Sequence, residues 1–301
     1  MLTSTTSPQE ATTGVLSRGV GRPTSRRNVV SAGAVGALAL VGGAAAPRAA
    51  FARQDAPATI VLVNGSWAGA WIWRDVIASL RAAGHNVYAA TLTGMGDRVH
   101  LTNVGIDLST HVTDVVNLIE FEDLTDVHLV GWSYSGLVIT GVAEAIPERL
   151  AQLIYLDAAV PQDGEDGYTA EGYGPDAIAF DVRAGIEAGW PGYYTYEPAA
   201  EWLAANIDNP ETLAWVESHF RPQTLGTYLQ PVDVSNPAAQ EIPHTFIFCT
   251  ENKGDASSDH TVRTRERVKD DPIWTVVELQ DTHLAPLNDP QAVAALLSSL
   301  V

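Results

Sequence analysis

From about residue 59 onward, short apolar runs alternate with segments that have helical periodicity. The runs are almost continuously apolar, which indicates strands buried on both faces of a parallel sheet. The predicted strands are residues 59–63, 86–90, 127–130, 152–156, 245–249 and 274–279. The predicted helices are residues 73–83, 109–120, 137–146 and 290–300. This alternation predicts an α/β fold with a doubly wound, mostly parallel sheet.

The alternation breaks between about residues 160 and 242. This segment holds eleven of the 23 aromatic residues of the chain, together with many prolines and glycines. It begins after a central predicted strand and ends before the predicted strand at residues 245–249. Ligands bind at the carboxyl edge of open α/β sheets, so we expect a cap insertion there that lines a pocket. The alternative is helical packing with no role in a site.

The first 52 residues have the pattern of an export signal. Arg26 and Arg27 precede a mildly apolar run rich in Ala, Gly and Val, and residues 50–52 read Ala-Phe-Ala. A charged region, an apolar region and a small-residue cleavage site make up a signal peptide. The paired arginines resemble a twin-arginine signal. We expect cleavage after Ala52, a mature domain of residues 53–301 and an exported protein without a stable membrane anchor; an uncleaved anchor is the alternative.

Composition narrows the classes of partner and cofactor. The net charge is −19, and residues 1–52 contain five of the 17 basic residues but one of the 36 acidic ones. Such an acidic surface repels polyanions, which argues against nucleic acid and acidic membranes as partners. The single Cys249 excludes an intramolecular disulfide framework. Metal-protease and phosphate-loop motifs are absent from the sequence, so we expect neither a metal nor a cofactor.

A serine lies where the third predicted strand meets the next predicted helix. Residues 131–136 read Gly-Trp-Ser-Tyr-Ser-Gly, and the small neighbours of Ser133 permit a sharp strand-to-helix turn. On such a turn the side chain projects above the sheet, and the following helix supplies N–H groups and a positive dipole end. The pattern predicts Ser133 as a nucleophile, with Ser135 in the place where the usual five-residue pattern has glycine.

A nucleophilic serine needs a base, and the base needs an orienting partner. His283 follows the last predicted strand and precedes the last helix, where the base belongs in a Ser-acid-His chain order on this fold. The acid should follow the strand at 245–249, where Glu251, Asp255 and Asp259 compete. Main-chain N–H groups should stabilise the oxyanion. We assign them to Tyr134 and to Ser66 in the loop after the first strand, where an ordinary glycine turn is the alternative.

Six segments, in this order, resemble the α/β-hydrolase superfamily. Within it they are similar to small esterases of the plant methyl esterase and hydroxynitrile lyase branch and its bacterial relatives. The segments are VLVNGSWAGAWIW, LTGMGDRVHL, VGWSYSG, YLDAAVP, IFCTENKGD and DTHLAPL. The resemblance runs from about Thr59 to the C-terminus. It implies Ser133 as nucleophile, His283 as general base, and the N–H groups of Ser66 and Tyr134 as the oxyanion hole.

Four positions depart from the family pattern. Asn64 and Trp132 stand where histidine is frequent, and Ser135 replaces glycine. The fourth departure concerns the acid, because plant members place it in a Thr-Glu-Asp string and this chain has Thr-Glu-Asn at 250–252. Asn252 can orient a histidine but cannot offset the imidazolium charge.

Three carboxylates are therefore ranked as candidates for the acid. Asp255 follows a small apparent insertion, and its interval to His283 matches the family better than that of Asn252. We prefer Asp255, with Glu251 second. The third candidate is Asp157, at the end of the strand at 152–156, where some hydrolases of this fold keep their acid.

These residues predict a serine hydrolase that cleaves a carboxylic ester, a lactone or an aryl ester through an acyl-enzyme. The aromatic insertion favours a small apolar or aromatic substrate. One alternative is a hydroxynitrile-lyase-like C–C lyase, but such enzymes use a lysine and a threonine where this chain has Leu284 and Gly65. The other alternative, motivated by Asn252 and Ser135, is a non-catalytic ligand-binding protein on a hydrolase scaffold.

Overall fold

The computed structural model describes residues 57–207, 209–256 and 258–301, so the predicted signal segment lies outside the described residues. Six parallel strands form the central sheet, in the order β2-β1-β3-β4-β7-β8. They are β1 (Thr59–Val63), β2 (Asn86–Ala90), β3 (Val127–Trp132), β4 (Leu150–Leu156), β7 (His244–Cys249) and β8 (Trp274–Leu279). All six predicted strands are present, and the predicted α/β fold with a doubly wound parallel sheet is confirmed.

The strand order reverses its winding direction at β1. This strand pairs with β2 on one side and with β3 on the other, and its residues Ile60 to Val63 are fully buried. Ligands bind at such a switch point, in the crevice outside the carboxyl ends of the strands. The turn that follows β3 carries Ser133, so the fold places this serine in that crevice.

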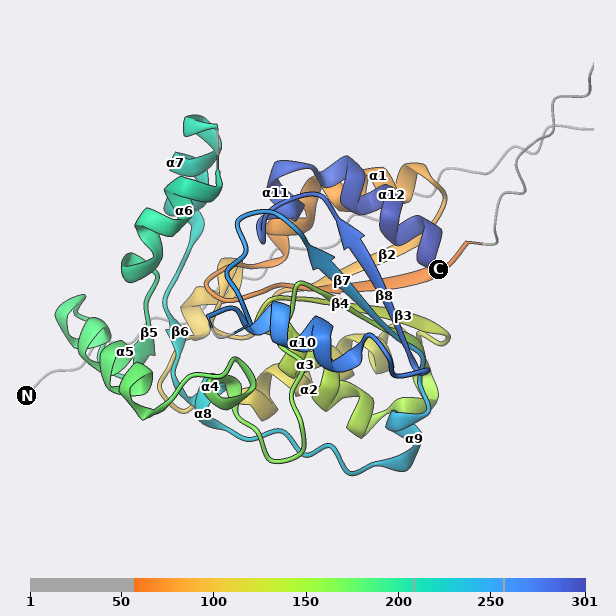
Figure 1. Ribbon diagram of the computed structural model, residues 1–301, viewed down its shortest axis with the longest axis horizontal. Helices are drawn as coiled ribbons and strands as arrows, with labels where there is room; N and C mark the ends of the chain where they lie inside the picture. Colours follow the sequence, from red (N-terminus) through yellow and green to blue (C-terminus); the bar gives the residue numbers. More distant parts are fainter. Residues whose placement is uncertain (1–56, 208, 257) are drawn as a thin grey trace, which may run out of the picture. The chain divides into compact units, whose positions relative to one another are not determined.

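Helices cover both faces of the sheet (Figure 1). On one face α1 (Arg74–Ala82) packs with α12 (Pro290–Leu300) through a core that includes Val76, Leu80 and Leu297. On the other face α2 (Leu108–Phe121) packs with α3 (Ser135–Ala145). The remaining helices outside residues 160–242 are α10 (His260–Val268), α11 (Ala285–Asn288) and the 3-10 turns η1 (Ala70–Trp73), η2 (Gly96–Leu101) and η3 (Pro147–Arg149).

Helix α10 has no counterpart among the helices predicted from the sequence. It carries few large apolar residues, and its buried side chains are Thr261, Thr264 and Val268. Its first turn is capped by the Asp259 carboxylate, which accepts from the N–H of Thr261 at 2.9 Å. A cap and a narrow face of small residues thus hold this helix, and neither gives the strong apolar periodicity on which sequence reasoning depends.

Residues 160–242, called the insertion below, connect β4 to β7, and these two strands are neighbours in the sheet. The insertion folds into short helices and one antiparallel strand pair, β5 with β6. Its elements are α4 (Gly167–Ala170), α5 (Pro175–Glu187), β5 (Tyr193–Tyr194), η4 (Glu197–Ala199), α6 (Ala200–Asn206), α7 (Pro210–His219), β6 (Gln223–Thr224), α8 (Gly226–Leu229) and α9 (Pro237–Gln240). Helices α5, α6 and α7 lie to one side of the layers that cover the sheet (Figure 1). Among the described residues, no helix has both the length and the apolar character needed to cross a membrane.

Candidate active site

Ser133 occupies a sharp turn between β3 and α3. Its φ is +59°, a left-handed conformation that a non-glycine residue seldom adopts. The turn is tied to β4, because the Ser133 N–H donates to the Leu156 carbonyl at 3.3 Å. Close packing requires glycine at position 136, where an added Cβ would lie 1.8 Å from the Ala159 carbonyl oxygen. The turn therefore holds the Ser133 side chain above the end of the sheet.

Ser135, which replaces the usual glycine, is fully buried inside this turn. Its Oγ accepts from the Trp132 N–H at 2.7 Å and lies 2.9 Å from each of the carbonyl oxygens of Val63 and Trp132. The hydroxyl thus connects the turn to the end of β1. The departure from the usual pattern adds a polar contact and leaves the turn itself intact.

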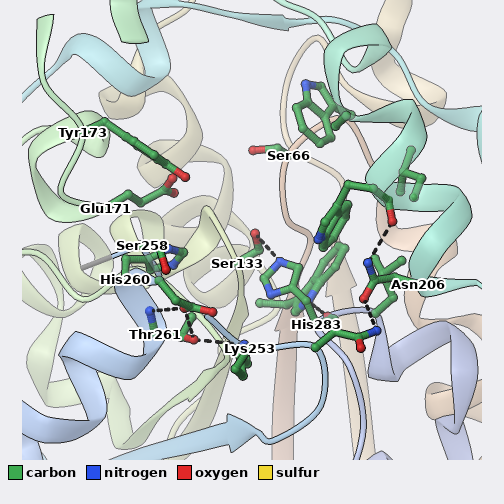
Figure 2. A pocket seen from close by; sticks show the side chains of 18 of the residues that line it. Ser66, Ser133, Glu171, Tyr173, Asn206, Lys253, Ser258, His260, Thr261 and His283 are labelled. Atoms are coloured by element: carbon green, nitrogen blue, oxygen red, sulfur yellow. Dashed lines mark hydrogen bonds between the residues drawn. The ribbon is translucent and has the colours of Figure 1, made fainter. Parts of the chain in front are cut away.

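His283 reaches Ser133 from the loop after β8. Its Nε2 lies 2.9 Å from Ser133 Oγ, and its Nδ1 lies 2.7 Å from Asp157 Oδ2. Trp132 supports this loop, because its indole N–H donates to the His283 carbonyl at 2.8 Å and its ring packs against the imidazole. The tryptophan that stands where histidine is frequent in the family therefore helps to place His283. Figure 2 shows Ser133 and His283 joined in the centre of the cavity.

Asp157 follows β4 directly and is fully buried, with a φ of +45°. One carboxylate oxygen accepts from the Cys249 N–H at 3.1 Å. The other lies 2.7 Å from His283 Nδ1 and 2.5 Å from Lys253 Nζ. Burial alone would raise the pKa of Asp157, but the hydrogen bond and charge of His283 together with the charge of Lys253 outweigh burial and lower it. The group is therefore a carboxylate at neutral pH.

This geometry contradicts the prediction that Asp255 is the partner of His283, and it also contradicts the second choice, Glu251. Both residues are exposed in the loop after β7, where Asp255 Oδ1 lies 3.3 Å from Ser258 Oγ. Asp259 caps α10. Asp157, the third candidate, lies beside His283 Nδ1. Chain interval misled the ranking because it does not report the direction of a side chain, whereas a carboxylate that ends a buried strand was a signal already visible in the sequence.

The loop after β1 approaches Ser133 closely. An added Cβ on Gly65 would lie 2.7 Å from the Trp132 ring and 3.0 Å from Ser133 Cβ, so this approach requires glycine. Asn64 is buried and holds the loop, because its side-chain amide donates to the carbonyls of Gly65 and Ala68 at 3.0 and 3.1 Å. Among the described residues, no acceptor is bound by the main-chain N–H of Ser66 or of Tyr134. Two free donors are thus available in the segments next to Ser133.

A cavity of about 330 Å³ opens above Ser133 and His283. The insertion supplies much of its wall, and Figure 2 shows Glu171 and Tyr173 on one side, Asn206 on the other, and Ser133 and His283 between them. The insertion residues that line it are Glu171, Tyr173, Tyr194, Ala199, Trp202, Leu203, Asn206, Phe220 and Tyr228. Asn252 lies at this wall, where its amide donates to Asn206 Oδ1 at 3.1 Å. No group of three or more His, Cys, Asp or Glu side chains among the described residues is arranged to hold a metal ion.

The chain is similar in sequence to known proteins over most of its length. The chain is 34% identical over 248 residues to a protein named carbendazim hydrolyzing esterase from Nocardioides sp. (strain SG-4G), which covers 81% of this chain and 99% of that protein. It is 25% identical over 265 residues to methylesterase 1 of Arabidopsis thaliana, covering 78% of this chain and 92% of that protein.

The fold likewise matches a solved structure. An extracellular α/β-hydrolase from a Paenibacillus species superimposes with a TM-score of 0.69 at 21% sequence identity, covering 81% of this chain and 98% of that one. A family model described as the alpha/beta hydrolase family matches residues 60–296, which include Ser133, Asp157 and His283. This protein therefore belongs to the alpha/beta hydrolase family.

Proposed function

We propose that this protein is a serine-dependent carboxylic-ester hydrolase that works through an acyl-enzyme. The observation that carries the proposal is the continuous chain of contacts from Ser133 through His283 to Asp157 at the floor of a cavity. The proposed base lies within hydrogen-bond distance of the nucleophile through Nε2 and of the orienting acid through Nδ1, which is the geometry that activates a serine. The two relatives described above are named as esterases, which supports the ester class.

In the first half of the reaction, Ser133 Oγ attacks the ester carbonyl while His283 Nε2 takes its proton. The Asp157 carboxylate holds the Nδ1–H of His283 and stabilises the imidazolium that forms. Lys253 shares that carboxylate and, together with His283, keeps it ionised inside the protein. The alcohol then leaves with the proton from His283, and the acyl group remains on Ser133.

The second half repeats these steps with water as the nucleophile. His283 takes a proton from water, which attacks the acyl carbonyl, and the acid leaves as Ser133 regains its proton. Each half passes through a tetrahedral oxyanion. We assign its stabilisation to the main-chain N–H groups of Ser66 and Tyr134, which are free of other acceptors and flank the nucleophile.

The insertion serves, in this proposal, as a cap that selects the substrate. It contributes both aromatic rings and polar groups to a cavity whose volume suits a small ester. Small apolar or aromatic esters, aryl esters and lactones are the expected substrates, and carbendazim and methyl esters are natural first compounds to test because relatives are named for them.

A direct test uses short p-nitrophenyl esters. We expect hydrolysis by the wild type and a loss of about 10⁴-fold or more in kcat for Ser133→Ala, because the residual rate then comes from binding and the oxyanion hole alone. A fluorophosphonate should label the wild type and leave the variant unlabelled. Full activity in Ser133→Ala would remove the serine mechanism, and absence of both hydrolysis and labelling in the wild type would favour a non-catalytic binding protein.

The geometry disfavours the lyase alternative. A lyase of the hydroxynitrile type would need a threonine at the position of Gly65, where even a Cβ would lie 2.7 Å from the Trp132 ring. The position after His283 is the fully buried Leu284, which offers no ammonium group.

We also propose that the protein is exported through a twin-arginine-type signal in residues 1–52, which lie outside the described residues. The support is the pair Arg26-Arg27, the apolar run and the Ala50-Phe51-Ala52 cleavage pattern. Expression in a bacterial host should yield exported protein that begins at Arg53 by N-terminal sequencing. Arg26→Lys with Arg27→Lys should retain the protein inside the cell, and unchanged export would contradict the proposal.

A further inference from the structure

Glu171 is a carboxylate of the insertion that the mechanism above does not use. It follows α4 and lines the same cavity as Ser133 and His283. Figure 2 shows it beside Tyr173, on the side of the cavity away from Asn206. A carboxyl group in this place can contact a substrate while Ser133 attacks it.

One oxygen of Glu171 is held and the other is free. Oε1 accepts from the Tyr228 hydroxyl at 3.3 Å, and that hydroxyl lies 2.9 Å from Ser66 Oγ. Oε2 has no hydrogen-bond partner among the described residues, and the carboxylate forms no ion pair with any of them. The nearby Arg263 guanidinium donates to the main-chain carbonyl of Glu171 and forms no ion pair with the carboxylate, on which its charge acts only through space.

Tyrosine rings surround this carboxylate. Tyr173, Tyr194 and Tyr228 line the cavity with it, and the rings of Tyr194 and Tyr228 meet edge to face at 5.0 Å between centroids. The row continues to Trp67, whose ring centroid lies 4.8 Å from that of Tyr194. The negative faces of such rings attract cations, and several rings beside a carboxylate are a common arrangement for binding an ammonium group.

We propose that Glu171, with Tyr173, Tyr194 and Tyr228, binds a cationic nitrogen of the substrate, so that the preferred esters carry a protonated amine or a quaternary ammonium group near the ester. The inference rests on the proposed ester hydrolysis and names a substrate class for it. The acidic composition of the chain favours the same sign of ligand charge. Lys253, the ammonium group that lines this cavity among the described residues, is already paired with Asp157.

The ionisation of Glu171 gives the proposal a signature in pH. Burial raises the pKa of Glu171 to about 8, so in the empty cavity the carboxyl is mostly protonated at neutral pH. Discrimination in favour of a permanently charged substrate should therefore increase as the pH rises from 6.5 through 8. The charged and titratable groups that act on this wall are Tyr168, Tyr173, Asp181, Tyr194, Tyr228, Asp259 and Arg263. Burial raises the pKa values of the four tyrosines, so these phenols stay neutral over that range.

Isosteric ester pairs test the proposal. One pair is 2-(trimethylammonio)ethyl acetate and 3,3-dimethylbutyl acetate; the reversed pair is methyl trimethylammonioacetate and methyl 3,3-dimethylbutanoate. Each pair differs by N⁺ in place of carbon, and the ratio of kcat/KM within a pair cancels the ionisation of the triad. Comparing this ratio between wild type and Glu171→Gln also cancels intrinsic reactivity. Above pH 8, where most of Glu171 is ionised, we expect it to fall at least threefold in Glu171→Gln for one pair. A 2-(dimethylamino)ethyl ester separates amines from quaternary groups.

The control variant is Glu251→Gln, which removes an exposed carboxylate from the rim of the same cavity. Solvent screens that charge, so the ratio should change less than twofold. In wild type the ratio should rise with pH through about 8, a readout that does not depend on a variant. A change below threefold in Glu171→Gln for both pairs, or a ratio independent of pH, would overturn the proposal.

Equilibrium binding separates this inference from the ester function. In Ser133→Ala, choline should bind more tightly than 3,3-dimethylbutanol, with both dissociation constants measured by the quenching of tryptophan fluorescence. Adding Glu171→Gln should remove this difference in affinity. If no ester is hydrolysed but choline still binds through Glu171, the ester function fails and the cation site stands. If choline and the neutral alcohol bind alike in Ser133→Ala, the cation site fails whatever the protein hydrolyses.

Discussion

The carboxyl ends of β4 and β7 lie side by side in the sheet, yet they hold their acidic residues in opposite ways. Asp157 at the end of β4 is fully buried, and its oxygens contact Cys249 N–H, Lys253 and His283. The loop after β7 carries Glu251 and Asp255 in exposed positions. That loop also supplies Lys253, a cation that pairs with Asp157.

The difference teaches that a carboxylate that orients a histidine must be held in one position as well as carry a charge. A buried carboxylate with three partners has one orientation, and its interaction with an imidazolium is weakly screened. An exposed carboxylate is hydrated and screened by salt, so it does little for a base several residues away. In this protein the end of β4 provides the carboxylate that contacts His283, and the loop after β7 provides the cation that pairs with it.

The largest expected effect comes from removing the buried charge. Asp157→Asn should lower kcat by about 10⁴-fold, because an amide neither holds the required tautomer of His283 nor stabilises the imidazolium. Asp255→Asn is the matched change in the β7 loop and should lower kcat less than threefold. Steady-state hydrolysis of a p-nitrophenyl ester measures both. A larger loss for Asp255→Asn than for Asp157→Asn would reverse the comparison.

A smaller effect is expected from the countercharge. Lys253→Met removes an ammonium group that is 12% exposed and lies 2.5 Å from Asp157 Oδ2. We expect the free energy of unfolding to fall by about 1–3 kcal/mol, since a buried carboxylate loses a charged hydrogen-bond donor. The kcat should fall about tenfold, less than for Asp157→Asn, because His283 keeps its partner. Urea unfolding and ester hydrolysis test this, and Lys269→Met, at an exposed surface pair, is the control.

The pH dependence of stability provides a third test. The pKa of Asp157 is lower in the folded protein than its ordinary value, so its stabilisation is fully present above about pH 4, where the unfolded group ionises. It is lost as the pH falls through the folded pKa, by about 1.4 kcal/mol for each unit of difference. The stability difference between wild type and Asp157→Asn should therefore shrink as the pH falls from 6 to 3, measured by urea unfolding. A difference that widens on acidification would contradict the depressed pKa.

The smallest effect is expected where the family pattern has its acid. Asn252→Asp should change kcat less than threefold, because Asp157 already occupies the place beside His283 Nδ1. In the double variant Asp157→Asn with Asn252→Asp, we expect less than tenfold recovery of kcat, since the side chain at 252 is directed to Asn206. Recovery beyond that would show that the two strand ends are interchangeable as sources of the acid.

Local pattern was sufficient to predict the sheet and the turn that carries Ser133. The six strands were predictable because buried parallel strands require continuous apolar runs, and Ser133 because a tight turn requires small neighbours. Helix α10 was not predictable in this way, since a side-chain cap and three small buried residues hold it. The role of Ser135 was also hidden, because its partners are main-chain groups on two different strands.

The sequence by itself determined the fold class and the positions of the proposed nucleophile and the proposed base, because each depends on a pattern that lies within a few neighbouring residues. The tertiary structure decided which carboxylate meets His283, how Lys253 is paired, and that Glu171 keeps a free oxygen toward the cavity. These depend on side-chain direction and on burial among segments that are 57 to 126 residues apart in the chain. Such contacts arise from packing between elements, which chain spacing does not record.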